Sequence, residues 1–161
     1  MIRALTMAGG IAGAAMLSQF PEFSQQYLQR LAGAVDELRG VTVAFDLTAK
    51  VAGLTRDQAL AKIGGSDFED SLRENMAGNM RRYERLSADY QALAGVAPLE
   101  RLALAWRFRD TDIARRTWDD YRPAVPVTSD GLVCAGIGFA GGWVILSLLL
   151  GLIARPFRRT A

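Results

Sequence analysis

The chain has 161 residues, the length of one ordinary domain, and half of its residues are hydrophobic. It contains no histidine and only one cysteine, which excludes histidine-based metal sites, Ser–His and Cys–His catalytic pairs, and an intrachain disulfide. All 17 acidic residues fall between Glu22 and Asp130, and the charged residues outside this span are Arg3, Arg155, Arg158 and Arg159. A mixed-charge middle between arginine-tipped apolar ends is typical of a membrane protein, and the net charge of +2 does not indicate nucleic-acid binding.

The first predicted element is a transmembrane helix within residues 1–20. Its apolar stretch, residues 4–20, is rich in Gly and Ala and is followed by Pro21. Its length is at the short end of the range for a spanning helix. A cleaved signal peptide is the alternative, because the stretch follows one basic residue and contains small residues at 12–14. We favour a retained anchor, since cleavage there would leave an apolar run of only about eight residues.

Residues 21–130 are predicted to form a helical extramembrane domain. The patterns Thr55–Gln58 and Ser66–Glu69 have the form of capping boxes and each begin a helix. The second of these helices is expected to be the longest in the chain. Its apolar side chains form one narrow stripe, which predicts a long antiparallel helical hairpin or a coiled-coil partner. The stripe consists of Leu72, Met76, Met80, Tyr83, Leu86 and Tyr90, with Phe68 and Leu93 at its ends.

Two shorter helices are predicted before the chain reaches the membrane again. Pro98 suits the first residue of one of them, and Asp110–Thr111 can cap the other. The proline-containing residues 123–127 then form an extended strut. No alternating strand pattern longer than four residues is present, so the expected fold class is all-α.

The second transmembrane helix is predicted at residues 131–154, and a basic tail, residues 155–161, follows it. The segment contains no charged residue and would run about 36 Å, enough to cross a hydrocarbon core of about 30 Å with some tilt. We therefore expect an all-α membrane protein in which two transmembrane helices flank the helical domain.

The charges at the chain ends predict the orientation of these helices. Arg3 lies at the outer end of the first, and Arg155, Arg158 and Arg159 lie at the outer end of the second. The positive-inside rule places both termini in the cytoplasm and residues 21–130 on the opposite side. In a bacterium with two membranes this is the inner membrane with a periplasmic domain, although mitochondrial and single-membrane hosts also fit the charges.

Small residues in both membrane helices predict close helix packing. Gly9 and Gly13 are four residues apart, as are Gly138 and Gly142, and this spacing allows helix backbones to approach in lipid. Trp143 lies at the midpoint of its helix rather than at an interface. We expect its ring to pack in a groove formed by Gly9, Gly10 and Gly13, in the same subunit or in a neighbour, and lipid exposure is the alternative.

The charged residues of the middle domain show no catalytic pattern. Asp119 and Asp120 are adjacent, so on a helix they point about 100° apart and suit no shared site. Arg81, Arg82 and Arg85 have Glu74, Glu84 and Asp89 nearby and are expected with them on a mixed solvated face, and a patch that binds anions or lipid headgroups is the alternative. The glycines at 9–13 have no preceding strand and no following Lys-Ser/Thr, which excludes a phosphate loop. No catalytic residue, cofactor or metal site is expected.

Two stretches resemble a known family. Residues 18–31 (SQFPEFSQQYLQRL) and residues 121–128 (YRPAVPVT) are similar to an uncharacterised proteobacterial inner-membrane family, a domain of unknown function. The resemblance covers essentially the whole chain and implies a two-span inner-membrane protein. It implies no activity, ligand or catalytic residue.

The functional expectation is a non-enzymatic structural or interaction protein of the inner membrane. Its partners would be the lipid bilayer and either other copies of the chain or other membrane proteins, and no nucleic acid is expected. A homo-oligomeric channel or transport-related protein is the alternative. Against a channel, the apolar stretches at residues 4–20 and 131–154 contain no ionisable residue apart from the cysteine, and most ion pathways use such residues.

Overall fold

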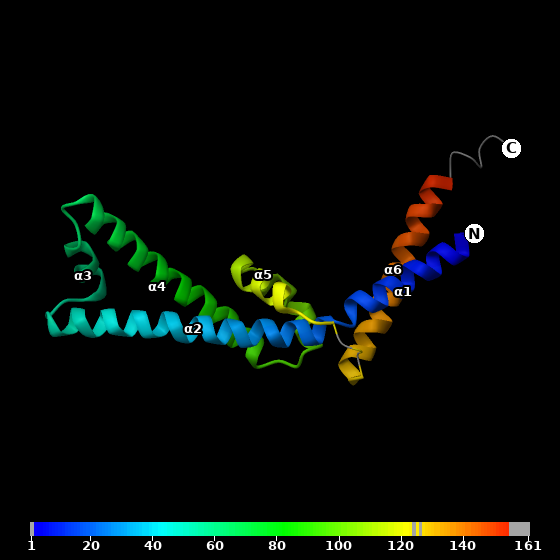
Figure 1. The fold of residues 1–161 in the computed structure, drawn as a ribbon, viewed down its shortest axis with the longest axis horizontal. Helices are drawn as coiled ribbons and strands as arrows, with labels where there is room; N and C mark the ends of the chain where they lie inside the picture. The colour runs from blue at the N-terminus through cyan, green and yellow to red at the C-terminus, as the bar shows by residue number, and fades with distance from the viewer. Residues whose placement is uncertain (1, 124, 126, 155–161) are drawn as a thin grey trace. The chain divides into compact units, whose positions relative to one another are not determined.

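The structure, a computed structural model, describes residues 2–123, 125 and 127–154 (Figure 1). In this part of the chain every regular element is helical and no strand is present, which confirms the all-α prediction. The arginines at 155, 158 and 159 lie outside the described residues. The elements are α1 (Ile2–Leu17), α2 (Phe20–Val51), α3 (Arg56–Lys62), α4 (Asp67–Ala94), the 3₁₀ helix η1 (Glu100–Arg107), α5 (Thr111–Asp120) and α6 (Ser129–Ala154).

The chain divides into two compact units. Unit 1 contains α1, the start of α2 up to Gln26, the segment Ala97–Ala105, and the chain from Thr117 through α6. Unit 2 contains Tyr27–Val96 and Trp106–Arg116. The boundary thus falls inside α2, which is one continuous helix.

In unit 1, α1 and α6 pack against each other in antiparallel directions, so the start of α1 and the end of α6 lie at the same end of the pair (Figure 1). By length and composition, Ser129–Ile153 could cross a membrane: the mean hydropathy of its most apolar 18-residue stretch is 2.1, and only 11% of that stretch is buried. It is the single such helix among the described residues. With 16 residues, α1 is about 24 Å long, shorter than a hydrocarbon core of about 30 Å. The first predicted span therefore stays a prediction.

In unit 2, α3 connects the far ends of α2 and α4 (Figure 1). Both predicted caps are present: Thr55 forms a full capping box with Gln58, and the Ser66 side chain accepts a hydrogen bond from the Glu69 backbone N–H. The prediction that α4 is the longest helix is wrong, because α2 has 32 residues against 28. An interior glycine at Gly40 lowers helix propensity but does not break the helix.

The core of unit 2 lies where the first half of α2 meets the second half of α4. Tyr27, Leu31, Leu86 and Leu93 are almost fully buried there. Within the predicted stripe Met76, Tyr83 and Tyr90 are half-buried, whereas Phe68 and Leu72, at the end near α3, are exposed. The fully buried positions of the stripe therefore lie in its C-terminal part, from Met80 to Leu93.

The connection from α4 to α5 differs from the prediction in one respect. The helix expected after Pro98 is the 3₁₀ helix η1, kinked at Leu104, rather than an α-helix. Asp110 caps α5 as expected, since the Ile113 backbone N–H donates to its Oδ1 at 3.2 Å.

Candidate functional site

The contact between α1 and α6 in unit 1 is made by backbone at two glycine pairs. A methyl group added at Gly13 would overlap the carbonyl oxygen of Gly138, and one added at Gly142 would overlap the carbonyl oxygen of Gly9. Within such a crossing any larger side chain would push the two helices apart. The predicted small-residue faces of the two helices thus lie against each other, in the geometry that lets membrane helices associate by dispersion contacts.

Within one chain, Trp143 does not occupy the glycine groove that was predicted for it. The side chain nearest to Gly9 is Leu146, and Gly10 packs against the ring of Phe139. Trp143 itself is 48% exposed. The groove is therefore already occupied by residues one turn away on either side of Trp143, and packing of Trp143 on a neighbouring subunit stays a prediction.

The hydroxyl side chains in and next to the helix pair donate hydrogen bonds to backbone carbonyls three or four residues earlier in the chain. Thr6 Oγ1 donates to the Arg3 carbonyl at 3.0 Å, Ser18 Oγ donates to the Ala15 carbonyl at 2.9 Å, and Ser147 Oγ donates to the Trp143 carbonyl at 2.7 Å. These bonds remove the cost of placing a hydroxyl in an apolar medium. The pair thus presents an almost wholly apolar outer surface.

A polar and aromatic junction forms at the end of the pair where α1 passes into α2. The Tyr121 hydroxyl donates to Gln19 Oε1 at 2.9 Å, and the Phe23 ring contacts Tyr121 and Trp118 edge-on. Arg101 of η1 is buried and donates to Gln25 Oε1 at 2.9 Å. Burial lowers the pKa of Arg101 and raises that of Tyr121.

In unit 2 a buried carboxylate fixes the chain after η1 to α4. Asp89 is 1% exposed. Its Oδ1 accepts from Arg107 Nη1 at 2.9 Å, and its Oδ2 accepts from Arg109 Nε at 3.1 Å. Phe108, between the two arginines, packs on Tyr27 of α2 with ring centroids 4.7 Å apart. Burial raises the pKa of Tyr27 to about 12.

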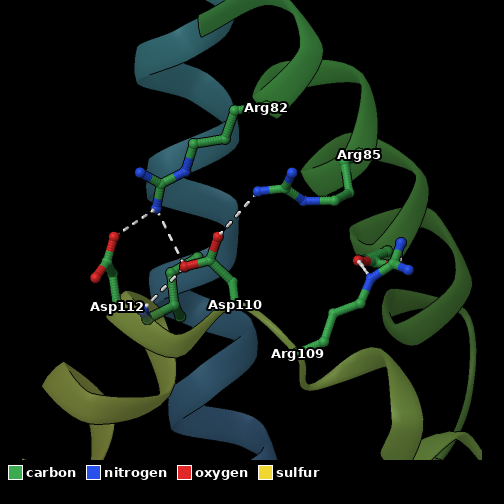
Figure 2. A network of polar contacts seen from close by, with 7 residues as sticks. Arg82, Arg85, Arg109, Asp110 and Asp112 are labelled. Atoms are coloured by element: carbon green, nitrogen blue, oxygen red, sulfur yellow. Dashed lines mark hydrogen bonds and ion pairs between the residues drawn. The ribbon is translucent and has the colours of Figure 1, made fainter. Parts of the chain in front are cut away.

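A second carboxylate, Asp110, joins the start of α5 to α4. Figure 2 shows Arg82 and Arg85 pointing from α4 towards it, with nitrogen–oxygen distances of 3.1 and 3.6 Å. Arg82 also lies 3.6 Å from Asp112, which is exposed. Ion pairs with a buried partner and good hydrogen-bond geometry hold segments in one arrangement, although burying the charges offsets much of their attraction.

A pocket of about 430 Å³ lies beside this cluster in unit 2. Its polar lining mixes Arg30, Arg82 and Arg116 with Glu37 and Asp112. Such a mixture selects neither an anion nor a cation. Among the described residues no group of three or more His, Cys, Asp or Glu side chains is placed to hold a metal ion. The contacts of the cluster are those of structural ion pairs between α4 and the start of α5.

Comparison with known protein families assigns the chain to one family. A family model described as "Protein of unknown function (DUF2937)" matches residues 1–159. The chain belongs to this family. The match takes in α1, α6 and everything between them, which confirms the resemblance to a domain of unknown function. Comparisons with curated proteins and with solved structures gave no match.

In this DUF2937 chain, sequence reasoning identified Asp110 as a cap but missed that both Asp89 and Asp110 are buried. Asp89 was expected, with Arg82 and Arg85, on a mixed solvated face, and this expectation is wrong for Asp89. One feature could have identified it: Asp89 lies three residues after Leu86 and four before Leu93, on the buried side of α4. An acidic residue at such a position needs buried partners, but their location in Arg107 and Arg109 depends on tertiary packing.

The glycine crossing predicts opposite effects for two alanine substitutions. Gly13→Ala should lower stability by about 1–3 kcal/mol, because the new methyl group overlaps the Gly138 backbone. Gly136→Ala, in α6 but with open space around the added methyl, should be neutral or slightly stabilising through helix propensity. Thermal unfolding in one detergent measures both, and equal midpoints would contradict the crossing.

The buried carboxylate predicts a similar contrast in unit 2. Asp89→Asn should cost about 2 kcal/mol, because Arg107 and Arg109 lose the charge that compensates them. Asp112→Asn removes the same charge from an exposed position and should cost less than about 1 kcal/mol. Urea unfolding followed by circular dichroism compares the two variants, and an Asp112→Asn effect as large as that of Asp89→Asn would refute the ranking.

Proposed function

We propose that this chain is a two-span protein of a bacterial inner membrane whose task is non-enzymatic: its helical domain, residues 21–130, provides a surface on which copies of the chain assemble. The proposal rests on one observation above the others. The side of α2 that faces away from the core of unit 2 is small and apolar where a solvent-exposed helix normally carries charge.

The outward face of α2 has heptad-like spacing. It runs through Gly33, Gly40, Ala44, Leu47 and Val51, in steps of seven, four, three and four residues. All five are exposed, Leu47 by 58% and Val51 by 90%. Apolar and small residues at this spacing form the contact stripe of paired helices.

Nothing within one chain requires the absence of a side chain at two glycines on this face. A glycine inside a helix costs roughly 0.5–1 kcal/mol relative to alanine. Gly9, Gly13, Gly138 and Gly142 are accounted for by a close backbone approach, but a methyl group at Gly33 or Gly40 would meet nothing within 4 Å. A second helix lying close to α2 would supply the missing reason.

A second copy is the partner that the charges beside this stripe favour. Asp36 and Lys50 are exposed and lie on the same flank, seven residues on either side of Val43. In an antiparallel pair of α2 helices centred near Val43, each Asp36 faces the Lys50 of the other chain. The exposed Phe68 and Leu72 at the beginning of α4 add apolar surface on the same hairpin.

The membrane part of the proposal places α1 beside α6 in the bilayer. The glycine crossing supports α1 as a second span, because it holds α1 along a helix that is apolar on all sides. Arginines near the outer end of each span favour cytoplasmic termini and a periplasmic hairpin. Tilting of α6 and local thinning of the bilayer would accommodate the short α1.

Light scattering of the nanodisc-embedded protein, corrected for lipid, tests the assembly. The wild-type mass should be a discrete multiple of the 17.5 kDa chain, and Leu47→Glu/Val51→Glu should lower it to one chain with unchanged helix content. Ala88→Glu, at an exposed position of α4 opposite Leu86, is the matched control and should leave the multiple intact. A wild-type mass of one chain would contradict self-assembly. A multiple that persists in the double variant would contradict the role of α2.

A further inference from the structure

Trp118 is a large aromatic side chain that remains mostly exposed in the fold. It is 70% exposed, although its ring contacts Phe23 at 6.4 Å and stacks with Tyr121 at 6.4 Å between centroids. Phe23 and Tyr121 in turn meet edge-on at 5.9 Å. These three rings, here called the aromatic cluster, belong to unit 1, which also contains the α1–α6 pair.

Hydrogen bonds and chain continuity place the aromatic cluster at one end of the helix pair. Gln19, which accepts from the Tyr121 hydroxyl through both its side chain and its carbonyl, lies two residues after the end of α1. Phe23 is in the first turn of α2, directly after this junction. Because α1 and α6 are antiparallel, the end of α1 and the start of α6 lie at the same end of the pair.

Other exposed apolar side chains gather at this end. Val125 and Val127 precede α6 and are 81% and 84% exposed. A groove of about 440 Å³ runs between the α1–α2 junction and the start of α6, with Pro21, Pro98 and these two valines in its wall. Exposed apolar groups beside charged ones such as Glu22 and Asp130 form a surface of mixed polarity.

Such a surface matches the headgroup layer of a bilayer. Tryptophan and tyrosine concentrate at membrane–water interfaces, because the ring leaves water while the N–H or O–H keeps a polar partner. A protein partner would also cover Trp118. The headgroup layer is favoured because the cluster lies where an apolar helix pair meets its polar junction, the level at which the bilayer surface must fall if α6 spans it.

We propose that the aromatic cluster, with Val125 and Val127, is a lipid-binding surface that inserts into the headgroup layer and fixes the depth of the α1–α6 pair. This inference rests on the proposed membrane insertion of α6. Its driving force is burial of rings and valines, and the acidic residues nearby do not favour anionic lipid. The contact therefore forms with zwitterionic phosphatidylcholine and does not require a negatively charged surface.

Depth-dependent fluorescence quenching tests this surface in the full-length chain. One variant keeps only Trp118 (Trp106→Phe with Trp143→Phe), and a second keeps only Trp143 (Trp106→Phe with Trp118→Phe). Both are reconstituted in phosphatidylcholine vesicles that carry a quencher either at the headgroup or near the end of the acyl chain. Circular dichroism confirms that each variant retains the wild-type helix content.

The expected result is that Trp118 emission is quenched about twofold more by the headgroup label than by the deep label, and that Trp143 shows the reverse order. If Trp143 responds to the deep label while Trp118 responds only to aqueous iodide, the lipid surface is refuted and membrane insertion stands. If neither tryptophan responds to lipid-borne quenchers, insertion of α6 is refuted as well, and the lipid surface with it.

Discussion

Backbone contact between α1 and α6 at two glycine pairs is the constraint on which unit 1 depends. Gly13 with Gly138, and Gly9 with Gly142, bring the helices so close that no side chain separates them. This contact joins two segments more than a hundred residues apart in the chain. It also brings the end of α1 to the start of α6, and the Gln19–Tyr121 hydrogen bonds and the aromatic cluster are built at that end.

Unit 2 is held together by a different interaction. Its buried apolar side chains come from α2, from the second half of α4 and from Ile113 of α5, and the segments around η1 and α5 are attached to α4 through charge. Asp89 forms ion pairs with Arg107 and Arg109. Asp110 caps α5 and forms ion pairs with Arg82 and Arg85. Removing a buried carboxylate leaves its arginines uncompensated, so these pairs specify an arrangement more than they add net stability. The apolar surface that remains on α2 and α4 is then available to another helix.

Local signals in the sequence predicted much of this structure. The Thr55 and Ser66 caps, the Asp110 cap and the apolar segment of α6 each depend on residues within a few positions of one another. The glycine faces were also visible, because spacing of four residues places them on one side of a helix. Gly40 lies inside α2 without ending it, because one weak helix former does not break a long helical pattern.

Features that depend on contacts between distant segments were not predictable in the same way. The pairing of Asp89 with residues 18 and 20 positions later requires the path of η1, whose kink at Leu104 has no clear sequence marker. Occupation of the Gly9–Gly10 groove by Leu146 and Phe139 rather than Trp143 depends on the rotation of α6 about its axis. The spacing of Gly138 and Gly142 indicates which side of α6 meets α1, but not which neighbouring side chain enters the groove.

The most direct test of the two-span arrangement is the side of the membrane on which each end of the chain lies. Single cysteines at Ile2→Cys, Lys62→Cys and Thr160→Cys, in a Cys134→Ser background, are treated with a membrane-impermeant maleimide in sealed vesicles of known orientation. If α1 crosses the bilayer beside α6, positions 2 and 160 react from one side and position 62 from the other. Reaction of positions 2 and 62 from the same side would show that α1 does not span, and would contradict the arrangement.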